Sequence, residues 1–538
     1  MMIRMRRRWL SLSRLVRSTT TIIPHCHHYY HSSSSSHQSS SQFLNRGRKW
    51  DAVVIGGGHN GLTAAAYLAK SGLKVAVLER RHVIGGAAVT EELIPGFKFS
   101  RCSYLHSLLR PCVIKELDLK RHGLRFLKRN PSSFTPCLDG RYLLLGPDAT
   151  LNHSEISKFS ERDAIAYPKY EGQLTKFCNI MDSLLDLPTP EIKSDLTSSI
   201  DFMADKFKKS AFWARLLQQS FLLGQKDMVD FMELMVSPAS RVLNNWFEAE
   251  ILKATLATDA VIGTTVCHVT VDESSGRVNG VMLSDGTHVF ASNVLSNATP
   301  YLTFMELVPK NVIPEEFMNA IRNLDYSSGT TKINIAVDRL PHFQCCRPDL
   351  SKAGPQHHGT IHIGAESLEE LDIAYKDGVN GLPSKRPIIE MTIPSVLDKT
   401  ISPPGKHVVN LFVQYTPYKL SEGCWQDLSF RESFARRCFA LIDEYAPGFS
   451  SSIIGYDMLS PPDLEKEFGL TGGNIFHGAM SLDSLFLMRP VKGWSGYRTP
   501  LRGLYLCGSG SHPGGGVMGA PGRNAANVVL QDIKTSAA

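Results

Sequence analysis

The sequence predicts an α/β protein whose main sheet is assembled from both ends of the chain. Three observations support this fold class. Residues 51–86 have the pattern of a strand, a glycine-rich turn, a helix and a second strand. Residues 503–530 have the pattern of a strand, a glycine loop and a helix. The long middle part has helical and β-type apolar spacing in turn, which predicts a mixed region of helices and strands.

The first glycine-rich turn has the spacing of a dinucleotide-binding unit. The apolar run Ala52–Ile55 predicts a buried strand, and Gly56, Gly58 and Gly61 follow it in the pattern G-x-G-x-x-G. The first glycine allows the tight turn, the second lets a pyrophosphate approach the backbone, and the third lets the helix pack on the strand. The free N–H groups and positive dipole end of that helix suit phosphate. This unit therefore predicts a Rossmann-like fold.

An acidic residue follows the second strand of the unit. The predicted strand Leu73–Leu78 ends at Glu79, which is 18 residues after Gly61. A carboxylate at this position can accept hydrogen bonds from the ribose hydroxyls of an adenosine. It disfavours the 2′-phosphate of NADP, but it does not separate NAD from FAD.

The first 50 residues differ in composition from the rest. They hold nine of the 58 basic residues and no acid, so the body has 49 basic and 51 acidic residues. The body is therefore not basic, and we expect no nucleic-acid partner. An Arg-rich, Ser-rich and acid-free start is typical of an organelle transit peptide. We predict a disordered transit peptide that directs the protein to the mitochondrial matrix, with the plastid as the alternative because of the run Ser32–Ser36.

Cysteine spacing and hydropathy exclude two further classes. The eleven cysteines include no C-x-x-C, and no C-x-x-x-x-C follows the first unit, where flavin disulfide reductases keep their redox pair. We therefore predict free thiols and no dithiol–disulfide chemistry. The sequence contains no apolar run of 18 residues, so we predict no transmembrane segment. Peripheral membrane contact stays open as an alternative. We predict no metal site, and that includes the histidines of the N-terminal segment.

The middle of the chain has a mixed pattern. Residues 155–262 have helical apolar spacing, residues 332–418 alternate as strands, and Asp285-Gly286 marks a hairpin turn between strands. We divide the chain into a transit peptide (1–50), three parts of a nucleotide-binding domain (51–150, 264–330 and 481–538), a helical part of a substrate domain (151–263) and its β part (331–480).

The C-terminal unit favours FAD over NAD. The predicted strand Leu504–Cys507 ends at Gly508, and a loop with four more glycines leads to a helix that begins near Gly519–Arg523. Opposite an isoalloxazine ring, the start of such a helix stabilises the negative charge of a reduced flavin. A nicotinamide enzyme does not need this second element at the far end of the chain.

Three segments together carry a family resemblance: GGGHNGL (56–62), LERRHVIGG (78–86) and LYLCGSGSHPGGGVMGAPGRNAA (504–526). They resemble the phytoene desaturase and carotenoid isomerase branch of the FAD-dependent amine oxidase-like superfamily, and the resemblance covers the chain after residue 50. It implies a Rossmann-like FAD-binding domain with an inserted α+β substrate domain. It also implies an FAD-dependent oxidoreductase that passes hydride from a hydrophobic or unsaturated substrate to the flavin.

One departure from this family concerns the end of the helical region. The family has a Gly-Gly-Met turn and a further helix before the chain returns to the FAD domain. Here the stretch that ends near Gly263 meets Val266 almost directly, so several dozen residues are missing relative to the family. In the family, that segment would help to cover the flavin.

The predicted site residues come from both glycine-rich units, and the resemblance supports their assignment. No pattern identifies a catalytic base, and we interpret His106 and His512, near the predicted flavin loops, as structural. The predicted cofactor-binding residues are Val54, Ile55, Gly56, Gly57, Gly58, His59, Asn60, Gly61, Glu79, Arg80, Gly85, Gly86, Gly508, Gly516 and Met518.

Three hypotheses for function follow. The first is an organelle FAD-dependent oxidoreductase with a small hydrophobic substrate. The second is a non-catalytic flavoprotein scaffold that binds a mitochondrial protein partner and so regulates mitochondrial function. The third is a plastid enzyme similar to carotenoid desaturases and isomerases.

Overall fold

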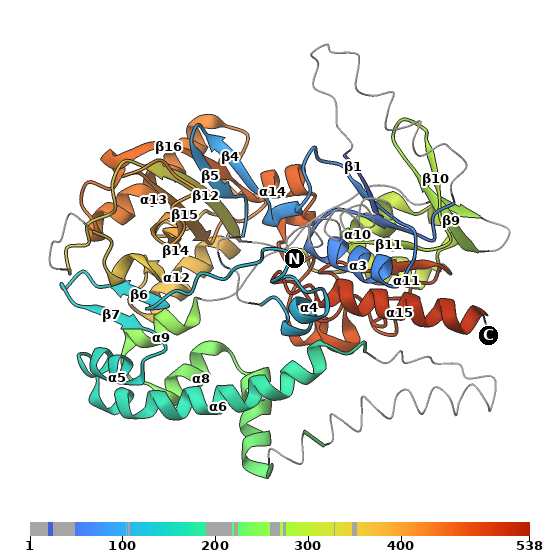
Figure 1. Ribbon diagram of the computed structural model, residues 1–538. Coiled ribbons are helices and arrows are strands. Elements are labelled where there is room, and N and C mark those ends of the chain that lie inside the picture. Colours follow the sequence, from blue (N-terminus) through green and yellow to red (C-terminus); the bar gives the residue numbers. More distant parts are fainter. Residues whose placement is uncertain are drawn as a thin grey trace, which may run out of the picture.

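The computed structural model describes residues 20–24, 49–103, 105, 108–189, 218–219, 224–258, 270–272, 276–327, 329–346 and 352–537. Two large sheets form the centres of two neighbouring parts of the molecule (Figure 1). The expectations for His106, for residues 202–217 and for the junction between Gly263 and Val266 lie outside the described residues. In the part of the chain just given, no helix combines the length and apolar content needed to cross a bilayer.

A five-stranded parallel sheet joins distant parts of the chain in the order β1-β3-β2-β11-β17. Its centre pairs Val54 of β2 with Leu295 of β11, and Leu295 with Tyr505 of β17. This arrangement confirms that both chain ends build one sheet. The strands are β1 (Thr20–Pro24), β2 (Ala52–Ile55), β3 (Val75–Glu79), β11 (Val294–Ser296) and β17 (Leu504–Leu506).

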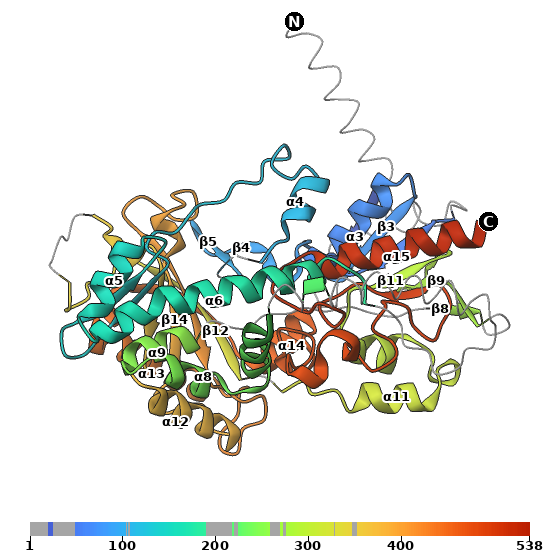
Figure 2. The same ribbon diagram turned by 90° about the horizontal axis from the view of Figure 1, so that it is seen from below.

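Two helices from opposite ends of the sequence lie side by side on one face of this sheet. Figures 1 and 2 show α3 (His59–Lys70) against α15 (Ala520–Ala537). Small residues make the close contact feasible, since a Cβ on Gly522 of α15 would lie 2.0 Å from the backbone oxygen of Asn60. The opposite face packs against α11 (Glu315–Arg322) and against the sheet β10-β9-β8, which contains the predicted hairpin.

The second large sheet has seven strands in the order β16-β12-β15-β14-β13-β6-β7. Neighbouring strands are antiparallel except β13 and β6. The strands are β6 (Ser133–Pro136), β7 (Tyr142–Leu145), β12 (Thr330–Val337), β13 (Thr360–Ile363), β14 (Ile388–Thr392), β15 (His407–Gln414) and β16 (Ile453–Leu459).

The two faces of this sheet differ because side chains alternate along each strand. Ile333, Ile335 and Val337 of β12 face an apolar core that is closed by α13 (Leu428–Tyr445). The alternate residues Lys332 and Asn334 are equally buried on the other face. One face is thus aliphatic and the other polar, although water is excluded from both.

The remaining helices surround these sheets. The long helix α6 (Glu161–Leu185) runs from α5 towards α15 in both views (Figures 1 and 2). A helix over residues 224–236 lies beside it. The other elements are β4 (Thr90–Ile94), β5 (Phe97–Ser100), α4 (Pro111–Glu116), α5 (Ala149–Ser157), α8 (Ala239–Trp246), α9 (Glu250–Ala257), β8 (Thr270–Asp272), β9 (Arg277–Met282), β10 (His288–Phe290), α10 (Pro300–Leu302), α12 (Leu368–Val379) and α14 (Pro461–Phe468).

Two expectations about organisation differ from the structure. We expected no structure in residues 1–50, but β1 pairs in parallel with β3 at the sheet edge, where β3 offers free backbone groups to the β-branched run Thr20–Ile23. We also placed the end of the first domain part at residue 150. The hairpin β6–β7 instead belongs to the seven-stranded sheet, because β6 pairs with β13.

Candidate cofactor site

The first glycine-rich turn begins where β2 ends. Val54 and Ile55 are buried in β2, and Gly56 follows with φ of +93°, a conformation that favours glycine. A Cβ on Gly61 would lie 2.1 Å from the backbone oxygen of Gly56. The turn and the first turn of α3 are therefore in direct backbone contact, which only glycine at position 61 permits.

The carboxylate of Glu79 is oriented by backbone N–H groups. Gly57 donates to Oε2 at 2.8 Å and Arg81 donates to Oε1 at 2.9 Å. The side chain is 7% exposed and lies at the end of β3. A carboxylate oxygen has a second lone pair, so this group can still accept hydrogen bonds from a diol.

The beginning of α3 is suited to an anion. Gly58 is the N-cap of the helix that begins at His59, and no side chain caps it. Gly85 donates its N–H to the oxygen of Gly57 at 2.8 Å, which brings the Gly85–Gly86 turn to the same place. The cleft formed here is lined by Gly58, Glu79, Arg80, Arg81, Gly86, Asn297 and Phe468. Backbone donors, the helix dipole and a carboxylate thus converge as a dinucleotide requires.

The C-terminal loop meets this cleft. Gly508 comes shortly after β17 and lies against Asn297, the residue that follows β11. A Cβ on Gly508 would lie 2.8 Å from the backbone oxygen of Asn297. Asn60 at the start of α3 donates from Nδ2 to Oγ of Ser509 at 3.2 Å. Oδ1 of Asn60 and Oγ of Ser511 are buried without a hydrogen-bond partner in the described part of the protein. Such orphaned atoms fit a bound polar molecule better than an empty core.

A buried arginine supports the same loop. The guanidinium of Arg489 donates to the backbone oxygens of Ser509, Phe476, Ala479 and Ser484. Burial lowers the pKa of Arg489 to about 10. No carboxylate forms an ion pair with it among the residues described. Its positive charge therefore lies behind the C-terminal loop and favours a negatively charged group in front of it.

His512 is held as a neutral structural residue. It is fully buried, and its Nε2 lies 3.1 Å from the oxygen of Leu184 at the end of α6. Burial lowers its pKa to about 4. Tyr497 donates to the backbone oxygen of His512 at 2.7 Å and accepts from Asn524 at 3.1 Å. The end of α6 and the C-terminal loop are thus joined by a buried polar network.

The other predicted site residues lie around the same loops. Gly516 has φ of +105°, and Met518 accepts a backbone hydrogen bond from Arg110 at 3.0 Å. Arg80 lines the cleft, but its guanidinium donates to the oxygens of Lys466 and Glu467 at the end of α14. The side chain of Arg80 therefore holds α14 against the cradle.

Sequence reasoning missed the contributions of the middle of the chain. Asn297 follows β11 and donates its N–H to the oxygen of Ile55 at 3.0 Å. Phe468 of α14 lies under Arg81, whose guanidinium carbon is 4.8 Å from the ring centroid. The position of Asn297 could have been inferred, because it ends a predicted parallel strand of the same sheet.

The most unusual side chain beside the site is Lys332. It is fully buried on β12, and its Nζ lies 2.6 Å from Oδ1 of Asn334 and 3.1 Å from Oδ1 of Asn410. Both partners are neutral, and burial lowers the pKa of Lys332 to about 7. A lysine within the apolar alternation of TTKINIAV was the signal that sequence reasoning passed over.

Backbone contacts connect Lys332 to the glycine cradle. Asn334 donates from Nδ2 to the oxygen of Arg101 at 3.4 Å. The next residue, Cys102, donates its N–H to the oxygen of Ala87 at 3.1 Å, directly after Gly86. The polar face of the seven-stranded sheet is thus separated from the cradle by a single segment of chain.

The thiols of Cys102 and Cys112, which follow the first glycine-rich unit, are unsuited to redox exchange. Burial raises the pKa of Cys102 to about 12 and that of Cys112 to about 11. A thiol, unlike a thiolate, is a poor nucleophile, so neither is activated. The sulfur atoms of Cys345 and Cys346 are 4.0 Å apart and form no disulfide. Both residues lie beside the apolar core of the seven-stranded sheet.

Comparisons with known proteins agree with this geometry. A family model described as an NAD(P)-binding Rossmann-like domain matches residues 54–113. Pyridine nucleotide-disulfide oxidoreductase domain-containing protein 2 of Rattus norvegicus is 46% identical over 552 residues, which cover 90% of this chain and 94% of that protein. Phytoene desaturase of Fusarium fujikuroi is 24% identical over 544 residues, 87% of each chain. A solved oxidoreductase from Methanosarcina mazei has 18% identity, a TM-score of 0.47, and coverage of 89% of this chain and 99% of its own.

The chain therefore belongs to the family of pyridine nucleotide-disulfide oxidoreductase domain-containing protein 2, and it is an oxidoreductase. The alignment with the rat protein has 552 positions. It covers 90% of the 538 residues of this chain, which is about 484 residues. The difference of about 68 positions is similar in size to the several dozen residues that we expect to be missing.

Proposed function

We propose that this protein binds FAD and oxidises a hydrophobic, unsaturated substrate in the mitochondrial matrix. The single observation that carries the cofactor assignment is the cradle, where an uncapped helix start, a carboxylate and the C-terminal glycine loop meet. The adenosine half would lie against Glu79, the pyrophosphate at the start of α3, and the flavin against the loop that follows Gly508. FAD supplies a two-electron acceptor at the flavin ring.

The charge distribution supports the flavin end of this assignment. Arg489 lies behind the loop with no acidic partner among the described residues, and the start of α15 lies after the same loop. Both would favour a ring that gains negative charge when it is reduced. The segment with Arg101 and Cys102 contacts both the glycine cradle and the polar sheet face that carries Lys332.

We propose Lys332 as the proton acceptor. Removal of hydrogen from adjacent carbons releases a hydride and a proton, and the proton needs a base, which for a lysine is the uncharged amine. A lysine with a pKa of about 7 is half neutral near physiological pH. Asn334 and Asn410 hold its Nζ by accepting hydrogen bonds, so the free lone pair keeps a fixed direction.

The relative named for desaturation supports the substrate class. Phytoene desaturase, by its name, introduces a double bond into an unsaturated hydrocarbon. The shared site would suit removal of hydrogen from a carbon–carbon bond. The alternative is a flavoprotein scaffold, and the gap in the alignment favours it, because that segment would help to cover the flavin.

An absorbance spectrum tests the cofactor. The purified full chain should be yellow, and denatured protein should release a chromophore that elutes with authentic FAD. Glu79→Gln should lower the FAD content, because an amide cannot accept from both ribose hydroxyls. Glu422→Gln, at an exposed position, is the matched control. Colourless protein that takes up no added FAD would refute the assignment.

The location is tested separately. Residues 1–50 fused to a fluorescent reporter should direct it into mitochondria. A plastid signal would move the protein to the plastid alternative, and a cytosolic reporter would end the targeting proposal.

A further inference from the structure

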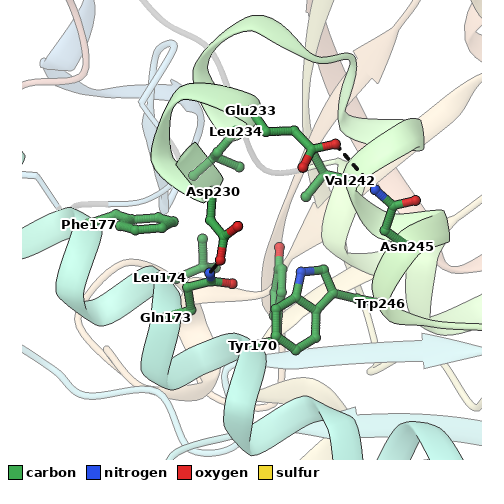
Figure 3. Close-up of a pocket in the computed structure, with 10 residues that line it drawn as sticks. All are labelled: Tyr170, Gln173, Leu174, Phe177, Asp230, Glu233, Leu234, Val242, Asn245 and Trp246. Atoms are coloured by element: carbon green, nitrogen blue, oxygen red, sulfur yellow. Dashed lines mark hydrogen bonds between the residues drawn. The ribbon is translucent and has the colours of Figure 1, made fainter. Parts of the chain in front are cut away.

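Three helices enclose a second cavity, of about 280 Å³, away from the cofactor cradle (Figure 3). Each helix contributes residues at positions i, i+3 and i+4, so one stripe of each faces the same space. The lining residues are Tyr170, Gln173, Leu174 and Phe177 of α6, Asp230, Glu233 and Leu234 of the helix over residues 224–236, and Val242, Asn245 and Trp246 of α8.

The polar groups of this cavity carry negative charge. Asp230 accepts from Nε2 of Gln173 at 2.6 Å, and Glu233 accepts from Nδ2 of Asn245 at 3.3 Å. Figure 3 shows both carboxylates beside these amides. No basic side chain forms an ion pair with Asp230 within the described ranges, and none lines the cavity.

Among the described residues, Arg241 is the cation that pairs with a carboxylate of the cavity lining. Nε of Arg241 is 3.6 Å from Oε1 of Glu233, but its side chain is 69% exposed and lies outside the lining. A solvated pair at this distance contributes little. The lining of the cavity therefore carries two carboxylates and no basic side chain.

The walls are aromatic and aliphatic. The rings of Tyr170 and Trp246 meet edge to face with centroids 5.6 Å apart, and Phe177 meets Phe231 in the same way at 5.3 Å. Leu174, Leu234 and Val242 complete the apolar surface. Electron-rich ring faces beside carboxylates attract an organic cation both by the ring quadrupole and by charge.

We propose that this cavity is a binding site for a small organic ammonium ion with an apolar body. The volume suits a small ligand of this kind rather than a long chain. A metal ion is a poor fit, because no group of three or more potential ligands among His, Cys, Asp and Glu occurs in the described residues. The site is separate from the cofactor cradle and does not depend on the function proposed above.

The long helix α6 connects the two sites. Phe177 lines the cavity, and Leu184 contacts His512 of the C-terminal loop seven residues later, which is about 10 Å along the helix axis. A ligand in the cavity would contact α6 over two turns. The site thus lies in the helical part of the substrate domain, at the middle of the helix whose last turn contacts the C-terminal loop.

Calorimetric titration of the full-length protein with three probes of equal size tests the proposal. The probes are 2-phenylethylammonium, its neutral counterpart 2-phenylethanol and the anion phenylacetate. The ammonium should bind at least about tenfold more tightly than the alcohol, and the anion should not bind. Asp230→Asn and Glu233→Gln keep the shape and remove one charge each, and each should weaken ammonium binding about tenfold.

Asp227→Asn is the matched control, because Asp227 lies on the same helix, pairs with Lys176 and does not line the cavity. It should leave the dissociation constant unchanged. Thermal melting of each variant shows that the fold is kept. Equal binding of all three probes, equal affinity in the Asp230→Asn and Glu233→Gln variants, or no ammonium binding up to about 10 mM would each overturn the proposal. None of these readouts requires FAD or activity.

Discussion

The two large sheets of this protein place their polar groups differently. In the parallel sheet the strands are mostly apolar, and the polar groups of the site lie at or just beyond the strand ends, such as Glu79 at the end of β3 and Gly57 after β2. In the seven-stranded sheet the polar groups lie within the strands, on one face, as in Lys332 and Asn334 of β12.

This difference follows from how each sheet is covered. Helices or further strands cover both faces of the parallel sheet, so a polar side chain inside it would lose water without a partner. The seven-stranded sheet needs one apolar face for α13, and the other face can carry groups that bind each other across strands. The polar side chains of the seven-stranded sheet therefore lie within its strands, whereas the carboxylate of the parallel sheet lies at a strand end.

The largest effect is expected at the backbone contact of the parallel sheet. Gly61→Ala should abolish cofactor binding, because the new Cβ would lie 2.1 Å from the oxygen of Gly56. The measurement is bound FAD per chain together with the melting temperature. Gly172→Ala is the control, since that helical glycine on α6 has nothing within 4 Å and alanine should stabilise it by roughly 0.5–1 kcal/mol. Normal FAD content in Gly61→Ala would show that the turn can adapt.

The second largest effect is expected for a substitution on the apolar face of the seven-stranded sheet. Ile335→Ala removes a fully buried side chain from the core under α13 and should lower the free energy of unfolding by about 2–5 kcal/mol. Urea denaturation measures it. The spectrum of bound FAD should be unchanged, because that face points away from the cradle. A loss below about 0.5 kcal/mol would mean that this core is loosely packed.

The polar face should show a dependence on pH. The pKa of Lys332 is lowered to about 7 by burial, while Cys102 and Asp457 raise it and Arg101 lowers it further. Below pH 7 the folded protein buries a charge. Between pH 7 and 10.5 the amine of Lys332 keeps its proton only in the unfolded chain, so the free energy of unfolding rises with pH. The cost of burying a charged lysine disappears over this range.

Lys332→Met should remove this rise. The difference in unfolding free energy between wild type and variant should therefore change by an amount on the order of a few kcal/mol from pH 7 to pH 10. Chemical denaturation at several pH values measures the difference. Parallel pH profiles for the two proteins would show that Lys332 stays charged in the folded state.

The smallest effect is expected on the outer side of α13. Arg436→Ala breaks a pair in which the guanidinium is 3.0 Å from Glu432, but the arginine side chain is 77% exposed. Such surface pairs contribute less than about 1 kcal/mol, and we expect about 0.5 kcal/mol or less. A urea titration checks this, and a larger loss would point to a contact of Arg436 beyond this surface pair.

The sequence by itself determined the parts of the site that rest on local spacing. Gly56, Gly61 and Glu79 could be placed because the distance from turn to acid is fixed by one strand–helix–strand unit. Leu504–Cys507 and the glycine loop could be assigned to the same sheet from their own pattern. The hairpin around Asp285-Gly286 was also predictable, because a short turn needs only its neighbours, although the structure has three residues between Leu283 and Thr287 rather than a two-residue turn.

Only the tertiary structure decided which distant residues face one another. Asn297 and Phe468 complete the cleft from segments that carry no glycine pattern. The hairpin β6–β7 joins the seven-stranded sheet through β13, more than 200 residues later in the chain. Lys332 becomes a titratable group near neutral pH because it is buried among amides rather than because of its neighbours in sequence. Pairing across long loops and burial depend on packing, which residue spacing does not encode.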